Sequence, residues 1–271
     1  MSLETFDADW LALRESADHR SRAGGMLTPL RDWWSEPGRT RVLDLGAGAG
    51  SNLRYLAPEL SGPQEWTLVD HDQGLMSRAR PPVPELAVST HCQDLREGVG
   101  ALVGRADLVT ASALLDLVSE AWLSALADVC SEARAGALFA LSYDGRVEWS
   151  GEADPADAAV LTAVNRHQRG DKGFGAALGP SAGPAADEAF RAHGYRTWLL
   201  PSPWVLESAD TELVRALVDG WADVAMERLP GERARVREWA DARSEDIAEG
   251  RVRLTVGHWD LLALPPDEGG P

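Results

Sequence analysis

The hydrophobic positions between residues 41 and 145 fall into short apolar runs that alternate with segments of helical spacing. Short apolar runs are typical of strands that are buried on both faces of a parallel sheet. The runs are RVLDL at 41–45, WTLVD at 66–70, one within ELAVSTHCQDL at 85–95, ADLVTASALL at 106–115 and ALFALSYDG at 137–145. Helical spacing occurs over 51–60, 71–80 and 119–135, where the chain is long enough for crossover helices. The alternation predicts an α/β fold with a doubly wound, mostly parallel sheet.

The chain outside this region predicts further helices and two more strands. Ahead of the first strand, an amphipathic helix is expected over 7–23 and a short one over 28–35. The later helices are expected at 154–168, at 185–194 and twice between 207 and 248, and the strands at 195–202 and 251–264. The last two strands lie far apart in sequence, yet their apolar content suits the same sheet.

The polar, Gly-, Pro- and Ala-rich stretch 146–183 and the helical stretch 205–249 interrupt this pattern. We predict that both are insertions that cap the carboxyl edge of the sheet. The expected single domain then divides into N-terminal helices at 1–40, a ligand-binding core at 41–145, the insertion 146–183, a helix and strand at 184–204, the helical insertion 205–249, the last strand at 250–265 and a flexible tail at 266–271.

Composition and charge narrow the class of protein. With 271 residues, the chain has the length of one elaborated domain. Its formal net charge of -17 argues against nucleic-acid partners, because binding phosphates requires clustered Lys and Arg. No apolar run approaches the roughly 20 residues that span a bilayer, and the acidic N-terminus is unlike a signal peptide. We therefore predict a cytoplasmic protein without membrane contact. Cys92 and Cys130 lack metal-site spacing, so we expect core thiols and no metal.

Three alternating glycines follow the first predicted strand directly. Gly46, Gly48 and Gly50 lie between the end of that strand and the start of a helix. At such a turn the missing side chains allow a ligand to lie against the backbone and the helix N-terminus. A tight turn without a ligand would show the same glycines, so the choice between the two interpretations depends on the surrounding residues.

Three carboxylates lie at strand ends where one ligand could use them all. Asp70 ends the second strand, 20 residues after Gly50, where it can accept hydrogen bonds from ribose hydroxyls. Asp94 follows the third strand and could receive an adenine amino group. Asp44, just before the glycines, could attract a cationic amino group. A ligand that combines an adenosine with an amino acid would contact all three carboxylates.

These segments, VLDLGAGAG at 42–50, LVD at 68–70, QDL at 93–95 and DLVTASALL at 107–115, resemble the class I S-adenosyl-L-methionine-dependent methyltransferases over about residues 40–145. The resemblance implies a seven-stranded sheet that ends in an antiparallel hairpin, with S-adenosyl-L-methionine as cofactor and S-adenosyl-L-homocysteine as product. It also implies cofactor contacts for Asp44, Gly46, Ala47, Gly48, Gly50, Asn52, Asp70, His71, Asp94, Leu95, Ala111 and Ser112. Arg14, on the N-terminal helix that covers the cofactor in many relatives, could bind the methionine carboxylate; a surface ion pair is the alternative. The two insertions depart from the minimal family fold.

Two other functions fit parts of the pattern. A nicotinamide dehydrogenase would need a glycine at position 51, which is Ser51, and normally a second catalytic domain. A non-catalytic partner or regulatory protein that binds S-adenosyl-L-methionine would keep all the cofactor residues. The sequence favours the methyltransferase and leaves the binding protein as the alternative.

The catalytic candidates follow from what methyl transfer requires, which is alignment of donor and acceptor and sometimes a base. Asp116 and Tyr143 follow the fourth and end the fifth predicted strand, although capping and turn roles would also explain them. The loop 165–175 holds Lys172, the only lysine of the chain, and His167. We hypothesise that this loop binds an acidic or carbonyl-bearing substrate with His167 as a general base, while a solvated surface turn is the alternative.

The sequence therefore predicts a methyltransferase that acts on a small-molecule acceptor at oxygen or nitrogen. The helices between 207 and 248 leave open a homodimer. The identity of the acceptor does not follow from these residues.

Overall fold

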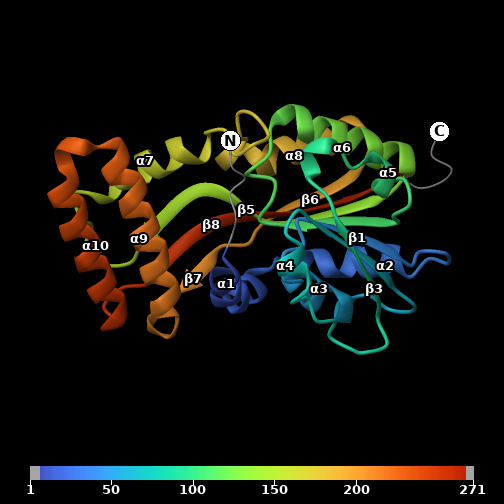
Figure 1. The fold of residues 1–271 in the computed structure, drawn as a ribbon, viewed down its shortest axis with the longest axis horizontal. Helices are drawn as coiled ribbons and strands as arrows, with labels where there is room; N and C mark the ends of the chain where they lie inside the picture. Colours follow the sequence, from blue (N-terminus) through green and yellow to red (C-terminus); the bar gives the residue numbers. More distant parts are fainter. Residues whose placement is uncertain (1–6, 267–271) are drawn as a thin grey trace.

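Strands from both halves of the chain form one mixed sheet. The structure, a computed structural model, describes residues 7–266, so the predicted tail lies outside the described residues except for Pro266. Over this range the sheet has eight strands in the order β3-β2-β1-β4-β5-β8-β6, with β7 paired to β8 (Figure 1). The strands are β1 Arg41–Leu45, β2 Glu65–Asp70, β3 Ala87–Cys92, β4 Leu108–Ser112, β5 Gly136–Trp149, β6 Arg196–Pro201, β7 Trp204–Leu206 and β8 Leu254–Leu264.

The strands β1 to β5 pair in parallel and confirm the predicted doubly wound core. β1 lies between β2 and β4, so the strand order reverses at its carboxyl end. In open α/β sheets the crevice at such a reversal is where ligands bind. The predicted antiparallel end is also confirmed, because β8 runs antiparallel to both β5 and β6.

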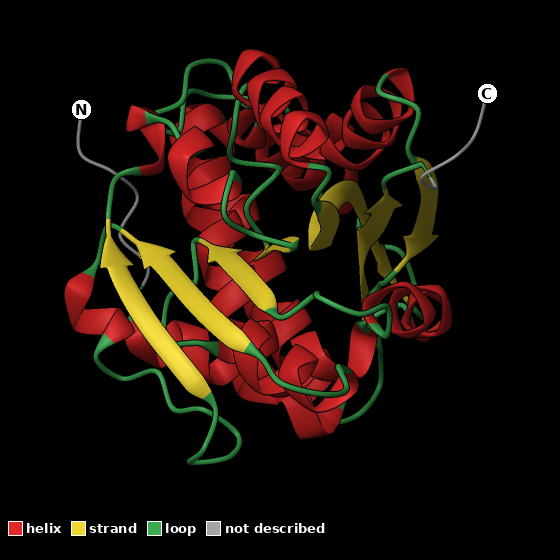
Figure 2. Ribbon diagram, turned by 90° about the vertical axis from the view of Figure 1, so that its right-hand side faces the viewer, coloured by secondary structure: helices red, strands yellow, loops and turns green. Residues whose placement is uncertain are grey.

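Helices cover both faces of the sheet (Figure 2). α6 and α8 pack on one face around Phe139 and Phe190, and α2 and α3 pack on the other around Trp34 and Leu53. The helices are α1 Ala8–Ser21, α2 Leu27–Trp34, α3 Ser51–Leu56, α4 Gln73–Met76, α5 Gly100–Val103, α6 Glu120–Ala133, α7 Asp157–Gln168, α8 Ala182–Ala192, α9 Thr211–Arg228 and α10 Arg233–Ala248.

Two predicted boundaries were wrong, because strands continue where insertions were expected. β5 runs on to Trp149, four residues into the expected insertion 146–183, and pairs there with β8. Half-buried Val147 and Trp149 alternate with exposed Arg146 and Glu148, so only one face of the strand is apolar. The polar residues of the other face masked this strand in the sequence. Similarly, the insertion expected over 205–249 begins inside β7.

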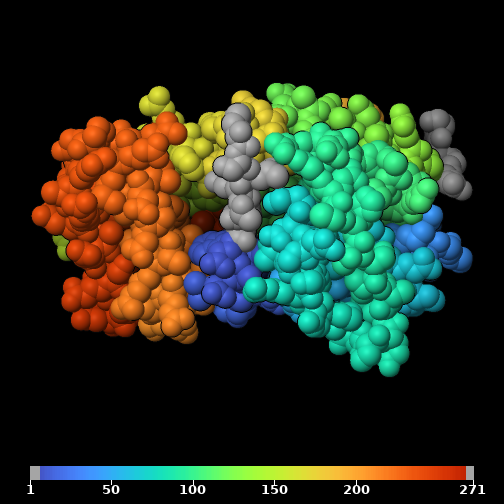
Figure 3. Space-filling view, in the orientation of Figure 1, coloured from blue at the N-terminus to red at the C-terminus, as the bar shows by residue number. Residues whose placement is uncertain are grey.

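The outer ends of β5 and β8, together with β7, α7, α9 and α10, form a second packed region that we call the helical lobe. Its core includes Trp204, Val218 and Trp239. Figure 3 shows the lobe (orange to red) and the glycine-loop half of the sheet (cyan to green) as two masses with α1 between them. Part of the predicted insertions thus forms a lobe beyond the carboxyl ends of the parallel strands.

The two cysteines differ in environment. Cys130 on α6 is buried, as predicted, and burial raises the pKa of its thiol to about 12. Cys92 is exposed at the end of β3, so the prediction of a core thiol was wrong there. β3 is an edge strand of the sheet and pairs with β2 alone. No helix within residues 7–266 is long and apolar enough to cross a membrane.

Candidate functional site

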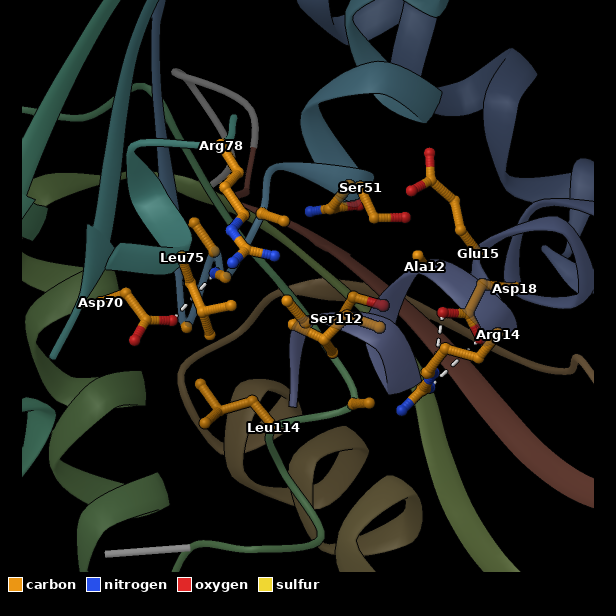
Figure 4. A pocket seen from close by; sticks show the side chains of 18 of the residues that line it. Ala12, Arg14, Glu15, Asp18, Ser51, Asp70, Leu75, Arg78, Ser112 and Leu114 are labelled. Carbon is orange, nitrogen blue, oxygen red and sulfur yellow. Dashed lines mark hydrogen bonds and ion pairs between the residues drawn. The ribbon is translucent and has the colours of Figure 1, made fainter. Parts of the chain in front are cut away.

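A cavity of about 580 Å³ opens at the carboxyl ends of β1, β2 and β4. Its walls come from the glycine loop, from the residues that follow β2, β3 and β4, from α1, and from Lys172 and Phe174 of the first insertion. The size falls within the 300–1,000 Å³ of typical small-molecule sites. Figure 4 shows Asp70 on one side of this cavity and Arg14 with Asp18 on the other. Most of the predicted cofactor residues, together with Lys172, thus line one cavity.

The glycine loop turns through backbone conformations that favour glycine. Gly48 has φ +50° and Gly50 has φ +78°, in the left-handed region. Gly46 and Gly48 line the cavity, whereas Gly50 begins α3 and packs against Ala79. A Cβ atom at position 50 would lie 3.0 Å from the Ala79 Cβ. The glycines therefore serve both the turn and the open wall, and Ala47 lines the cavity beside them.

Asp70 lies at the end of β2 and holds the glycine loop in place. Its Oδ2 accepts a hydrogen bond from the Gly48 amide at 2.8 Å, and its Oδ1 accepts one from the Asp72 amide at 2.9 Å. His71, also on the cavity wall, lies with Nδ1 3.2 Å from Asp70 Oδ1. A carboxylate has about four acceptor positions, so Oδ2 keeps room for a ligand hydroxyl. This arrangement suits the predicted contact to a ribose.

Asp94 and Leu95 line the cavity after β3. Asp94 accepts hydrogen bonds from the Arg96 amide and guanidinium, and this contact holds the pKa of its carboxyl below the usual value. Asp94 is therefore ionised at neutral pH, with Arg96 as its partner beside the cavity.

Asp44 is placed differently from the prediction of a direct ligand contact. It is buried behind Asn52, which does line the cavity and donates from Nδ2 to Asp44 Oδ1 at 2.8 Å. The Oδ2 of Asp44 has no hydrogen-bond partner among the described residues. Burial raises the pKa of this carboxyl to about 7. Asp44 does not line the cavity, because its strand places it one layer below.

Helix α1 covers the glycine loop and contributes residues that the motifs do not mark. A Cβ atom on Gly48 would lie 3.3 Å from Leu11 Cδ1, and Glu15 pairs with Arg54 of α3 at 2.7 Å. Arg14 lines the cavity, but its guanidinium forms a two-point ion pair with Asp18 at 2.9 and 3.1 Å. Arg14 thus lies at the cavity as predicted, and its ion pair with Asp18 is largely buried, unlike the surface ion pair of the alternative.

The chain after β4 enters the cavity through a turn that sequence reasoning covered only partly. Ser112 lines the cavity as predicted, whereas Ala111 is buried and does not. Ala113 has φ +52°, a conformation uncommon for a residue with a side chain. This turn brings Leu114 and Leu117 into the wall, where the sequence showed only an apolar run.

Of the predicted catalytic residues, only Lys172 lines the cavity. Its Nζ lies 3.3 Å from Nδ1 of His167, which stands behind it at the end of α7. Tyr143 is buried and donates to Asn165 Oδ1 at 3.0 Å, and burial raises the pKa of its phenol far above the usual value. Asp116 is buried beside the turn where its carbonyl accepts from the Gly179 amide. The structure therefore does not place His167, Tyr143 or Asp116 at the cavity wall.

Arg78 is a cavity residue that no motif indicated. Its guanidinium points into the cavity from the turn after α4 (Figure 4). The signal available in the sequence was an arginine 8 residues after Asp70, which is too common to single out. Within residues 7–266, no cluster of three or more His, Cys, Asp or Glu could hold a metal ion.

Comparisons with known proteins agree with this geometry. Residues 42–136 match the family model of a methyltransferase domain. No curated protein is significantly similar in sequence to the chain. A cyclopropane-fatty-acyl-phospholipid synthase-like protein from Lactobacillus casei matches with a TM-score of 0.53 at 15% identity, over 97% of this chain and 96% of that one.

Two further solved structures resemble the chain less closely. A methyltransferase from Geobacter sulfurreducens, in complex with S-adenosyl-L-homocysteine, has a TM-score of 0.47 at 17% identity, over 96% of this chain and 99% of that one. The phosphoethanolamine N-methyltransferase 2 of Haemonchus contortus has a TM-score of 0.46 at 13% identity, over 97% of this chain and 59% of that one.

Residues 42–136 match a methyltransferase domain, and the described chain has the α/β fold of the class I methyltransferases. S-adenosyl-L-methionine is the cofactor of such domains. The cavity fits such a cofactor, because a bare glycine loop, the Asp70 carboxylate and the Arg14 guanidinium lie along one elongated space.

Proposed function

We propose that this protein transfers a methyl group from S-adenosyl-L-methionine to an oxygen or nitrogen atom of a small, acidic or carbonyl-bearing acceptor. The observation that carries the proposal is the lining of the larger cavity. This lining includes both the glycine loop with Asp70 and two residues of the first insertion, Lys172 and Phe174. A cofactor and a small acceptor could therefore meet in one enclosed space.

The cofactor end of the cavity would use residues from three strand ends. Asp70 would accept hydrogen bonds from the ribose, Asp94 and Leu95 would face the adenine, and Arg14 would bind the methionine carboxylate across the cavity. When bound, the cofactor supplies a methyl group on a positively charged sulfur. Helix α1 would exclude water from this end, since Leu11 packs over the glycine loop.

The acceptor end combines apolar walls with positive charge. Leu114, Leu117 and Phe174 supply apolar surface, and Lys172 and Arg78 supply cationic groups. Because the chain carries a net charge of -17, the Lys172 and Arg78 cations in this cavity favour an anionic acceptor group. His167 would position the Lys172 amine through their 3.3 Å contact. This contact gives His167 a positioning role in place of the predicted role as a base.

A small-molecule acceptor is preferred over nucleic acid for the same electrostatic reason. Clustered phosphates would require a strongly basic outer surface, whereas the chain carries a formal net charge of -17. We also propose a cytoplasmic location. A measurement of molecular mass in solution would test whether the chain forms a homodimer through the helical lobe.

The test is a methyl-transfer screen that measures S-adenosyl-L-homocysteine release with a metabolite panel in which each carboxylic or phosphate acceptor is paired with its neutral analogue. We expect turnover with acidic acceptors, reduced at least tenfold in kcat/KM by Lys172→Met. Arg166→Met, an equal loss of charge at an exposed position of α7, should stay within twofold of wild type.

Two results would contradict the proposal. Equal turnover of acidic and neutral acceptors, untouched by Lys172→Met, would refute the acidic substrate class. Tight binding of S-adenosyl-L-homocysteine without transfer to any acceptor would favour the binding protein that was left open.

A further inference from the structure

The helical lobe contains a second cavity, of about 240 Å³, that the methyltransferase site does not use. It lies between the outer end of β5, α7, α9 and α10, and its lining shares no residue with that of the larger cavity. Three tryptophans face it from three different elements: Trp149 of β5, Trp221 of α9 and Trp239 of α10.

Hydrogen bonds fix the walls of this cavity. Trp239 donates from its indole Nε1 to Asp157 Oδ1 at 2.8 Å, and the Arg243 guanidinium grips the same carboxylate. Arg243 also lies over the Trp149 ring, 5.0 Å from its centroid. Arg243 is only 3% exposed and does not itself line the cavity, so it supports the lining through its contacts with Asp157 and Trp149. Two of the three rings, those of Trp149 and Trp239, are therefore held in place at the edge of the cavity.

The one charged group of the lining, the Asp157 carboxylate, is already fully hydrogen-bonded, which limits the chemistry of a ligand. Asp157 accepts from Trp239 and the Arg243 Nε on Oδ1, and from the Asp154 amide and the Arg243 Nη2 on Oδ2. Four donors fill the acceptor positions of a carboxylate, and Arg243 balances its charge. The remaining lining is aromatic and aliphatic, including Val147 and Leu161. A ligand there would meet ring faces and methyl groups and no unpaired charge.

We propose that this cavity is a binding site for a small, uncharged aromatic molecule of about two fused rings. Its volume exceeds the roughly 150 Å³ of an apolar cavity that binds benzene. Trp149, Trp221 and Leu161 are half-buried, so the hollow reaches the surface and a ligand can enter. The site is independent of the cofactor and stands or falls separately from the proposed methyl transfer.

The test is a calorimetric titration with 2-naphthol, an uncharged two-ring probe, and with 2-naphthoate, its anionic counterpart. S-adenosyl-L-homocysteine is present in excess so that the cofactor end of the larger cavity is filled, and the variants below distinguish binding in the lobe from binding at its acceptor end. We expect 2-naphthol to bind and 2-naphthoate to bind at least tenfold more weakly.

Two variants locate the binding. Leu161→Trp fills the hollow from α7 and should weaken 2-naphthol at least tenfold, whereas Val205→Trp adds the same ring at an exposed position of β7 and should leave it within twofold. If Leu161→Trp does not fold, Trp221→Ala removes one wall and should weaken binding at least fivefold. Three results would overturn the proposal: no binding of 2-naphthol, equal binding of 2-naphthoate, or binding of 2-naphthol that Leu161→Trp and Trp221→Ala both leave unchanged.

Discussion

The two cavities are built from different parts of the chain. The larger one is made by strand ends and a glycine turn, where backbone and a few carboxylates form the wall. The smaller one is made by helix faces and the end of one long strand, where three indole rings form the wall. One site therefore depends on backbone conformation and the other on side-chain packing, and each should respond to a different kind of mutation.

The largest expected effect is loss of the buried ion pair in the helical lobe. Arg243→Ala leaves the Asp157 carboxylate partly buried without its counter-charge and should lower the free energy of unfolding by about 3 kcal/mol. Urea unfolding measures the change. Arg251→Ala, at a half-exposed ion pair just after the same helix, should change it by less than about 1 kcal/mol. Equal effects of both variants would show that the pair does not hold the lobe.

The second effect is a pH dependence of the free energy of unfolding that arises from Asp44, beneath the larger cavity. Folded Asp44 keeps its proton up to its pKa of about 7, whereas the unfolded chain releases it near the ordinary value of 3.8. The folded state therefore binds more protons in this window, and its stability falls as pH rises from about 4 to 7.

Asp44→Asn should remove this fall, so its stability relative to wild type should increase by a few kcal/mol between pH 5 and pH 8. Denaturant unfolding at several pH values measures the difference. Asp32→Asn, at an exposed carboxyl of α2, should keep a constant difference from wild type. A constant difference for Asp44→Asn as well would contradict the raised pKa.

The third effect is the change in stability when a glycine is replaced by alanine, which should have opposite signs in the glycine loop and in the helical lobe. Gly50→Ala places a Cβ atom in a left-handed conformation, 3.0 Å from Ala79 Cβ, and should destabilise the fold by about 1–2 kcal/mol. Gly220→Ala, in the middle of α9 with open space around it, should stabilise by about 0.5–1 kcal/mol. Thermal unfolding compares the two, and a stabilising Gly50→Ala would refute the conformational requirement.

The smallest effect concerns the contact between α1 and the lobe. Arg20 pairs with Asp210 at 2.7 Å, but half of the arginine side chain is exposed. Arg20→Gln should therefore lower the stability by less than about 0.5 kcal/mol, and 0.5 M NaCl should erase the difference. A loss above 1 kcal/mol would mean that this pair fixes α1 over the larger cavity.

The sequence predicted the backbone-built half of the molecule well. Apolar runs indicated the five parallel strands, and the spacing from Gly50 to Asp70 indicated a ligand site at their ends, because parallel strands buried on both faces leave a local pattern. The same spacing placed Gly48, Asp70 and Asp94 around one cavity.

The lobe and the catalytic candidates could not be predicted in this way. Trp149 and Trp239 meet only after chain segments far apart in sequence have packed, and no local spacing encodes that contact. Tyr143 shows the converse case, because its place at a strand end suggested the site although its side chain enters the core. Residue type and strand position cannot decide which face a side chain takes when the strand is buried on both.

The most direct test of the central claim is calorimetric titration with S-adenosyl-L-homocysteine, with NADH in parallel. The account predicts micromolar binding of S-adenosyl-L-homocysteine, at least tenfold weaker in Asp70→Ala and unchanged in Asp128→Ala, an exposed carboxyl on α6, with no binding of NADH. No binding of S-adenosyl-L-homocysteine, or equal binding by the folded Asp70→Ala variant, would contradict it.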